Sequence, residues 1–319
     1  MQATRRRILT ALAEGPVTGP DLAAELDVSR AAIWKQVEAI REAGFDIQSG
    51  PDGYTLESIP DFGGPAVEFG LAAPFEVEYH DAIESTNQRA RELATDGRED
   101  VVVLADEQTG GKARLDRTWA SPSGGIWLSL VLRPSVPPAH APAFTIAAAL
   151  AVTHAARETG VDARIKWPND VVVPADDAAG SAYGAQKLAG ILTEMEGEAD
   201  RVSWLVIGMG INVNVNLASL PSEANPTSVR EQVGDVDRRV FTQRVLERFD
   251  EARQNLHETV TAAAERSATL GARVRVDTGR GEVVGEAVDI EFPGSLVVRT
   301  DDGDVTVTAG DCEHLRPAE

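Results

Sequence analysis

The stretch Ile126-Trp127-Leu128-Ser129-Leu130-Val131-Leu132 decides the fold, because six of its seven residues are apolar. A strand with one solvated face alternates apolar and polar residues, whereas a nearly continuous apolar run is typical of a strand covered on both faces. We therefore predict a central strand in a mixed sheet with helices packed against it, which is an α+β fold.

Similar signals extend to both sides of this strand, between residues 72 and 268. Further strands are predicted at residues 75–79, 101–105, 164–167, 187–195 and 204–213, and helices at residues 87–94, 143–159 and 240–267. The intervening stretch 174–186, rich in Asp, Ala, Gly and Ser, predicts a solvated loop. These elements predict one main domain over residues 61–269, which begins after a short linker of Pro and Gly.

The N-terminal residues 1–60 predict a winged helix-turn-helix domain. Helices are expected at residues 6–13 and 21–26, and Ser29 is a suitable N-cap for a third helix that runs to residue 41. Gly50-Pro51-Asp52-Gly53 has the chemistry of a hairpin turn and would form the wing.

The third helix of this domain is the candidate DNA-reading element. The residues that we expect to contact DNA are Ser29, Arg30, Ala31, Trp34 and Lys35. Residues 1–58 contain six Lys or Arg and nine Asp or Glu, a net charge of −3. Because DNA binding usually relies on basic residues that neutralise phosphate, a protein-interaction module remains the alternative.

The C-terminal residues 270–319 predict a small SH3-like β-barrel. Short strands at residues 272–276, 285–290 and 296–300 are separated by turns, and Asp301-Asp302-Gly303-Asp304 would close a hairpin. We expect a docking module without chemistry of its own, with Cys312 as a small buried apolar residue.

Composition narrows the class of protein. The chain has 319 residues, 43% of them hydrophobic, which suits two or three packed domains. No apolar run approaches the roughly 20 residues that span a bilayer, the N-terminus lacks a secretory signal, and Cys312 is the single cysteine. These features predict a cytoplasmic protein that binds no membrane.

The net charge of −21 predicts a surface adapted to high salt, with an acidic mesophilic protein as the alternative. The five histidines are scattered along the chain and indicate no metal triad. Against this acidic background, Gly111-Lys112-Ala113-Arg114-Leu115-Asp116-Arg117-Thr118-Trp119 is a cationic loop with small residues. Such a loop suits a negatively charged ligand, such as a nucleotide phosphate or a mixed anhydride.

Several motifs occur together with this loop in one order. They are Ser85-Thr86-Asn87, Gln108-Thr109, Trp119-Ala120-Ser121-Pro122, Gly124-Gly125, Lys166-Trp167-Pro168-Asn169-Asp170, Lys187-Leu188-Ala189-Gly190 and Gly208-Met209-Gly210-Ile211-Asn212. With them the chain resembles the biotin protein ligases, and its N-terminal module resembles that of the bifunctional members, which also repress the biotin operon. The resemblance covers nearly the whole chain.

This resemblance implies a function. The enzyme would use ATP with Mg²⁺ to form biotinyl-5′-AMP and pyrophosphate, and would then transfer biotin to a lysine of a biotin carboxyl carrier domain. It implies a catalytic domain like that of class II aminoacyl-tRNA synthetases, a homodimer, and operator DNA as a further partner.

The resemblance also implies the site residues. Lys187 and Arg114 would be catalytic, because cations offset the repulsion between the carboxylate and the phosphate. Biotin and its adenylate would contact Ser85, Thr86, Asn87, Gln108, Gly111, Lys112, Ala113, Arg114, Gly124, Gly125, Lys187, Gly190 and Gly210. ATP would contact Arg117, Trp119, Lys166, Asn169 and Asn212, and the amides of Asn169 and Asn212 would hold Mg²⁺.

The cationic loop departs from the family pattern Gly-Arg-Gly-Arg. Lys112 keeps the charge but loses the guanidinium fork, Leu115 removes a cation, and Ala113 would be strained if its backbone needs a positive φ. A loose loop would release the adenylate.

Three alternative functions stay open on the sequence alone. The first is a biotin-sensing DNA-binding regulator with decayed ligase activity. The second is a lipoate or octanoyl transferase, some of which use a pocket cysteine; Cys312 lies far along the chain from every pocket motif. The third is a ligase that does not repress.

Overall fold

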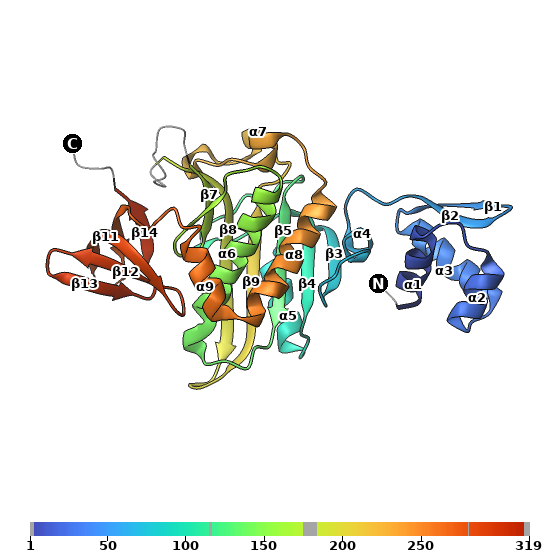
Figure 1. The fold of residues 1–319 in the computed structure, drawn as a ribbon, viewed down its shortest axis with the longest axis horizontal. Coiled ribbons are helices and arrows are strands. Elements are labelled where there is room, and N and C mark those ends of the chain that lie inside the picture. Colours follow the sequence, from blue (N-terminus) through green and yellow to red (C-terminus); the bar gives the residue numbers. More distant parts are fainter. Residues whose placement is uncertain (1–2, 115–116, 175–183, 280, 316–319) are drawn as a thin grey trace.

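The computed structural model describes residues 3–114, 117–174, 184–279 and 281–315. Three parts follow one another along the long axis of the molecule (Figure 1): a helical part with a hairpin, a central sheet covered by helices, and a small β part. The coarse prediction of a mixed α/β protein with terminal accessory domains is thus confirmed. Leu115 lies outside the described residues.

The central sheet has seven strands in the order β3-β4-β5-β9-β8-β7-β6. Only β3 and β4 run parallel among its neighbouring strands. The bounds are β3 Glu76–Ile83, β4 Val101–Gln108, β5 Ile126–Leu132, β6 Arg164–Lys166, β7 Asp170–Val173, β8 Gln186–Gly197 and β9 Val202–Ile211.

The predicted central strand is β5, and every one of its residues is buried. Alternate residues pack on opposite faces: Leu130 belongs to a cluster with α6 (Ala141–Glu158), whereas Val131 packs with α5 (Thr86–Thr95). Helices α8 (Arg238–Gln254) and α9 (Leu256–Ala264) lie beside α6 on the same face of the sheet (Figure 1). The apolar run therefore reflects burial on both faces.

Helix α6, with the preceding turn η2 (Pro138–His140), is the one described helix apolar and long enough to cross a membrane. However, 72% of its apolar window is buried inside the protein. It packs against α8, α9 and the sheet, which accounts for its composition. The short elements η3 (Leu217–Ser219), η4 (Ser222–Ala224) and α7 (Val229–Val233) follow β9.

The structure corrects two local predictions. The helix predicted at 240–267 is two helices, because Asn255, with φ −142° and ψ 83°, ends α8 and caps α9 through Glu258 N. The four-residue strand β7 was not predicted.

The N-terminal part forms the predicted three helices and hairpin. These are α1 (Ala3–Ala13), α2 (Gly19–Leu26), α3 (Arg30–Glu42), β1 (Asp46–Gly50) and β2 (Gly53–Ser58). Ser29 Oγ accepts from Ala32 N at 3.1 Å, as an N-cap does. A Cβ at Gly53 would lie 2.3 Å from Val17 O, so the hairpin requires glycine for its approach to the backbone just before α2.

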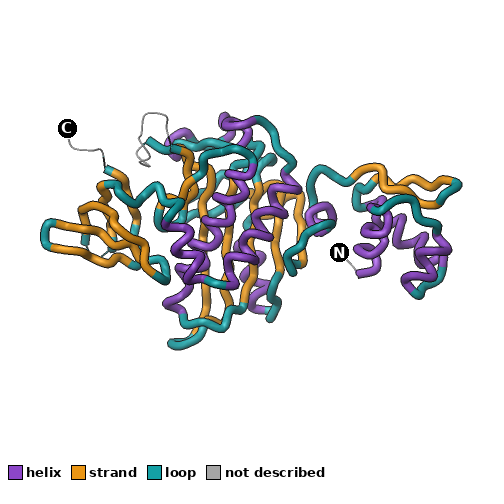
Figure 2. Tube along the Cα trace, viewed as in Figure 1, coloured by secondary structure: helices purple, strands orange, loops and turns teal. Residues whose placement is uncertain are grey.

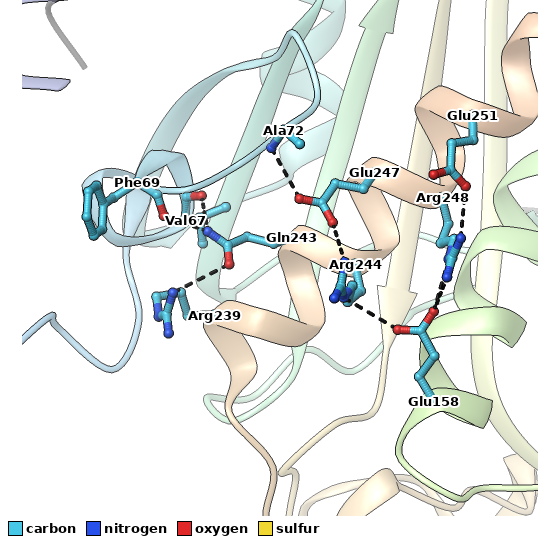
Figure 3. Close-up of polar contacts among 10 residues, drawn as sticks. All are labelled: Val67, Phe69, Ala72, Glu158, Arg239, Gln243, Arg244, Glu247, Arg248 and Glu251. Atoms are coloured by element: carbon cyan, nitrogen blue, oxygen red, sulfur yellow. Dashed lines mark hydrogen bonds and ion pairs between the residues drawn. The ribbon is translucent and has the colours of Figure 1, made fainter. Parts of the chain in front are cut away.

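Helix α4 (Gly64–Glu68) joins this part to the central domain, and α8 holds it there (Figure 3). Gln243 Nε2 donates to Val67 O and to Phe69 O, both at 2.8 Å, and Glu247 Oε1 accepts from Ala72 N at 3.1 Å. The Phe69 ring meets Phe45 of the N-terminal part edge-on, with 6.0 Å between the centroids. The buried Gln243 side chain therefore contributes two of the hydrogen bonds that hold the junction.

The C-terminal part is an antiparallel sheet in the order β13-β12-β11-β10-β14. The strands are β10 (Arg273–Asp277), β11 (Glu282–Glu291), β12 (Ser295–Thr300), β13 (Gly303–Val307) and β14 (Asp311–His314), shown as strands at one end of the chain trace in Figure 2. Trp167 Nε1 donates to Gly294 O at 2.8 Å, and the Thr269 hydroxyl contacts His314 Nε2 at 3.1 Å. These buried contacts fix the sheet against the central domain.

Candidate active site

A cavity of about 590 Å³ lies at the meeting of α5, the cationic loop, strands β7 to β9 and the C-terminal sheet. It brings together most of the predicted site residues from distant parts of the chain. Those that line it are Ser85, Thr86, Asn87, Gln108, Lys112, Ala113, Arg114, Arg117, Trp119, Lys166, Asn169, Lys187, Gly190 and Gly210. Gly111, Gly124, Gly125 and Asn212 are not among the lining residues.

One end of the cavity is polar and hydrogen-bonded. Ser85 caps α5 by accepting from Gln88 N at 3.4 Å. Gln108 Oε1 accepts from Thr86 N at 2.8 Å and from Thr86 Oγ1 at 3.0 Å, while its Nε2 donates to Ser121 Oγ at 2.9 Å. Thr86 is therefore held by side-chain contacts that fix its position.

The floor of the cavity is made by glycines beneath two larger side chains. A Cβ at Gly210 would lie 2.4 Å from Trp119 Nε1, and one at Gly190 would lie 3.1 Å from Trp119 Cζ3. A Cβ at Gly208 would lie 2.0 Å from Asn87 Oδ1. The sheet register is continuous from Gly208 to Gly210, so these glycines make room for side chains and form no bulge.

Lys187 lies beside this floor. Its Nζ forms an ion pair with Asp170 Oδ1 at 2.7 Å, at angles outside those of a hydrogen bond, and it lies 5.1 Å from the Trp119 ring centroid. The two charged side chains are 26% and 20% exposed. Trp119 Nε1 is buried and has no hydrogen-bond partner among the described residues. The cavity thus combines a half-buried ammonium group with a free indole donor.

Arg114 connects the cationic loop to the C-terminal sheet. Its Nη1 donates to Asn169 Oδ1 at 2.9 Å and its Nη2 to Gly310 O at 2.8 Å, while Arg117 pairs with Asp311 at 3.3 Å. The C-terminal part, expected to be a docking module without chemistry of its own, also lines the cavity. It adds Arg275, Asp277, Glu282, Asp311, Cys312 and Glu313 to the lining.

Cys312 is buried, as predicted, but it lies at the cavity although its position in the sequence is remote. Burial raises the pKa of its thiol to about 12, and this outweighs the opposing charge of Lys166. Because the thiolate is the nucleophile, a thiol that stays protonated at neutral pH attacks an acyl group poorly. The alternative of an acyl transferase that uses a pocket cysteine is therefore disfavoured.

The strain predicted at Ala113 is absent. Ala113 is not among the residues with positive φ, so its Cβ carries no strain of that kind. The tight position is Gly111, where a Cβ would lie 2.5 Å from Trp119 O and 2.8 Å from Ser121 Oγ. Gly124 and Gly125 serve the neighbouring turn: Gly124 has φ 102°, and a Cβ at Gly125 would overlap the Trp127 ring.

The two asparagines predicted to hold Mg²⁺ differ in their surroundings. The Asn169 amide is already used, since its oxygen accepts from Arg114 and its nitrogen donates to Ile191 O at 2.8 Å. Asn212 is 3% exposed and does not line the cavity; its nitrogen donates to Thr227 O at 3.0 Å, and its oxygen has no hydrogen-bond partner among the described residues. Within the described ranges, no cluster of three or more His, Cys, Asp or Glu could hold a metal ion.

The predicted DNA-contacting residues lie on one face of α3 and its cap. Ile33, Val37 and Ile40 are buried, whereas Ser29, Arg30, Ala31, Trp34 and Lys35 are exposed. Trp34 is 59% exposed, which is unusual for so large an apolar side chain.

Sequence reasoning missed Asp170 and Gly208 as site residues. Asp170 is the last residue of the motif at 166–170, and it forms an ion pair with Lys187. Its place in that motif was the available signal. Gly208 gave no signal of its own, because its role depends on Asn87 lying above it.

Comparisons with known proteins agree with this arrangement. Residues 79–212 match the biotin/lipoate A/B protein ligase family, residues 4–55 match a helix-turn-helix domain, and residues 269–315 match the biotin protein ligase C-terminal domain. The bifunctional ligase/repressor BirA of Bacillus subtilis (strain 168) is 33% identical over 313 residues, which cover 93% of each chain.

Two further relatives support the catalytic part. The biotin–[acetyl-CoA-carboxylase] ligase of Mycobacterium tuberculosis is 36% identical over 235 residues, covering 68% of this chain and 79% of that protein. The structure of the Aquifex aeolicus biotin protein ligase in complex with biotin and ATP aligns with a TM-score of 0.62 and 26% identity. It covers 76% of this chain and 99% of that one.

Proposed function

The chain belongs to the biotin protein ligase family, among its bifunctional ligase/repressors, and from this membership we propose that it activates biotin with ATP and transfers it to a protein lysine. The acceptor would be the biotin carboxyl carrier domain of a carboxylase. The observation that carries the proposal is the cavity that joins the ammonium group of Lys187 to the polar end at Thr86 and Gln108.

Binding and orientation follow from the cavity's two ends. A neutral urea ring needs a few donors and acceptors in an otherwise apolar pocket, and Ser85, Thr86, Asn87 and Gln108 supply them. The carboxylate at the other end of biotin would then approach Lys187. Its ammonium group offsets the repulsion between that carboxylate and the α-phosphate, and stabilises the charge that develops on phosphorus.

The nucleotide would lie over the Trp119 side of the cavity. Trp119 offers an aromatic face and an unpaired Nε1 donor, and Arg117, Lys112 and Lys166 bring positive charge to the same cavity. Asp170 would hold the Lys187 ammonium group in place before the substrates arrive. Arg114 would close the cavity against the C-terminal sheet while keeping a cation near the phosphates.

We assign no side chain to Mg²⁺, because the Asn169 oxygen accepts from Arg114 and Asn212 does not line the cavity. If Mg²⁺ accompanies the nucleotide, phosphate oxygens and water are its natural ligands, and it would neutralise phosphate charge there.

The ligase proposal is tested by following the two steps separately. The protein is incubated with ATP, Mg²⁺ and biotin, and pyrophosphate release and biotinylation of an added carrier domain are both measured. We expect pyrophosphate release that depends on biotin, followed by biotinylation of the carrier. Release without transfer would support the alternative of a biotin-sensing regulator with decayed ligase activity.

We also propose that the N-terminal part binds operator DNA through the exposed face of α3 and represses transcription in response to biotin. The helix-turn-helix match and the whole-length similarity to a ligase/repressor support this proposal. Footprinting of the protein's own upstream region, with and without biotin, tests it. If the protein has ligase activity but protects no DNA under either condition, the alternative of a ligase that does not repress is favoured.

Several finer features remain proposals. Family membership supports a homodimer, and the mixed sheet and the antiparallel C-terminal sheet suit a class II aminoacyl-tRNA synthetase-like domain and an SH3-like barrel. The net charge of −21 supports a halophilic protein. Cytoplasmic location follows from the substrates proposed.

A further inference from the structure

Trp34 of helix α3 is the one exposed tryptophan among the five of the chain. The other four are buried or half-buried, and each contacts another residue; they are Trp119, Trp127, Trp167 and Trp204. The Trp34 side chain is 59% exposed and has no hydrogen-bond or ring partner among the described residues. Because the fold makes no use of this large apolar side chain, its exposure indicates a contact with another molecule.

The part of α3 around Trp34 carries positive charge and no carboxylate. Residues 29–36 include two cations, Arg30 and Lys35, whereas the carboxylates of the helix begin at Glu38. Arg30 and Lys35 are exposed and form no ion pair among the described residues. In a domain whose residues 1–58 have a net charge of −3, two unpaired cations beside an apolar ring indicate an anionic partner that also offers apolar groups.

The position of Trp34 along the helix indicates which groups of DNA it would meet. In a helix-turn-helix domain, the N-terminal residues of the recognition helix contact base edges in the major groove. Trp34 lies within the first two turns of α3, and the exposed Ala31, three residues before it, shares its side of the helix. The two form a small apolar surface at this end of the helix. Among the four bases, thymine alone presents a methyl group in that groove.

We propose that Trp34 is a specificity-determining residue for operator DNA, whose ring contacts the C5-methyl group of a thymine in the major groove. This inference rests on the operator binding proposed above. Lys35 would contact phosphate, which positions the helix without reading sequence. Because the domain is acidic, apolar contact with bases would supply a larger share of the affinity than in a basic domain, and release of counterions a smaller share.

The test replaces thymine by deoxyuridine, which removes only the methyl group and keeps every hydrogen-bonding group of the base. The full-length protein is footprinted on its own upstream region, with and without biotin. The dissociation constant of the protected duplex is then measured with each thymine replaced in turn. At the thymine that Trp34 contacts, loss of the methyl group should weaken binding about fourfold, as expected for burial of one methyl-sized group.

Trp34→Ala completes a double-mutant cycle with this substitution. It should weaken binding to the natural duplex about tenfold, because the variant loses the apolar contact of the ring. Deoxyuridine at the contacted position should then cause no further loss, since the methyl group no longer has its partner.

Two further variants are matched controls. Trp34→Phe keeps an aromatic face but loses the indole N–H, so it should retain most of the difference between thymine and deoxyuridine. Lys35→Gln removes one phosphate contact and should lower the salt slope of binding by about 1. It should weaken binding to both duplexes equally, so that the difference between them is unchanged.

The outcomes distinguish this inference from the proposed function. If the protein protects no part of its upstream region, with or without biotin, the operator proposal and this inference are overturned together. Protection that no deoxyuridine substitution weakens would overturn the inference alone. Wild-type operator affinity in Trp34→Ala would also overturn it and would assign the exposed ring to a protein contact. Loss of the thymine preference in Trp34→Phe would overturn it in favour of a hydrogen bond from the indole. The thymine comparison uses the wild-type protein, so it holds even if a variant fails to fold.

Discussion

Gly111 and Ala113 of the cationic loop should respond in opposite ways to substitution. At Gly111 a methyl group would lie 2.5 Å from Trp119 O and 2.8 Å from Ser121 Oγ, whereas Ala113 has an unstrained backbone. Trp119 N donates to Gly111 O at 2.9 Å, so the contact lies at the base of the loop. In Gly111→Ala the added methyl group must push Trp119 O and Ser121 Oγ away from residue 111 at the base of the loop.

The size of the effect follows from overpacking. Forcing a methyl group into a filled position costs about 1–3 kcal/mol. At about 1.36 kcal/mol for each factor of ten, loop closure would weaken roughly 5- to 150-fold. Ala113→Gly removes no contact of this kind and changes mainly the freedom of the unfolded chain, by about 1 kcal/mol or less.

The assay is release of the reaction intermediate. Labelled adenylate is formed on the protein, free substrates are removed, and unlabelled adenylate is added as a chase. Gly111→Ala should shorten the residence time by the factor given above, while Ala113→Gly should stay within about fivefold of the wild type. Equal residence times for Gly111→Ala and wild type, or a larger effect at Ala113, would refute the reasoning.

Three further outcomes are expected. Cys312→Ala should retain ligase activity. Wild-type Cys312 should resist iodoacetamide at pH 8, because burial raises the pKa of its thiol to about 12. Rapid alkylation of the folded protein would contradict this expectation. Burial lowers the pKa of His314 to about 4, below its ordinary value of 6.5. The neutral form therefore contributes stability that is fully present above pH 6.5 and is lost as the pH falls toward 4, by up to about 3 kcal/mol. Urea unfolding across this window should show the loss of stability, and His314→Gln should reduce that loss. Gln243→Leu leaves Val67 O and Phe69 O unpaired and should lower the stability of the junction by about 1–3 kcal/mol. Limited proteolysis between residues 60 and 72 should become faster, while carrier biotinylation is retained. Unchanged proteolysis would show that the glutamine does not hold the junction.

Local patterns in the sequence predicted much of the fold. The apolar run of β5 reports burial on both faces, and Ser29 and Ser85 each cap a helix as their residue type favours. The break at Asn255 was not predicted, because helical periodicity continues across it and the asparagine ends one helix while starting the next. A single residue's backbone angles decide that break.

The candidate site was predictable in its residue types but less so in its contacts. Lys187, Gly190 and Gly210 could be proposed from their motifs, yet the reason for the glycines is the Trp119 ring above them. The contact of Arg114 with Gly310 O joins residues far apart in the chain, and no local pattern reports such a distance. For the same reason, the sequence predicted that Cys312 lies away from the pocket motifs, whereas in the structure it lines the cavity.

The most direct test of the proposed role of Lys187 in the cavity is biotin-dependent exchange of labelled pyrophosphate into ATP, compared between wild type and Lys187→Gln. Wild type should catalyse exchange only when biotin is present. Lys187→Gln should lose about 100-fold or more of the exchange rate, as expected when a group that stabilises the transition state is removed. Exchange at the wild-type rate in Lys187→Gln, or no biotin-dependent exchange in the wild type, would contradict the account.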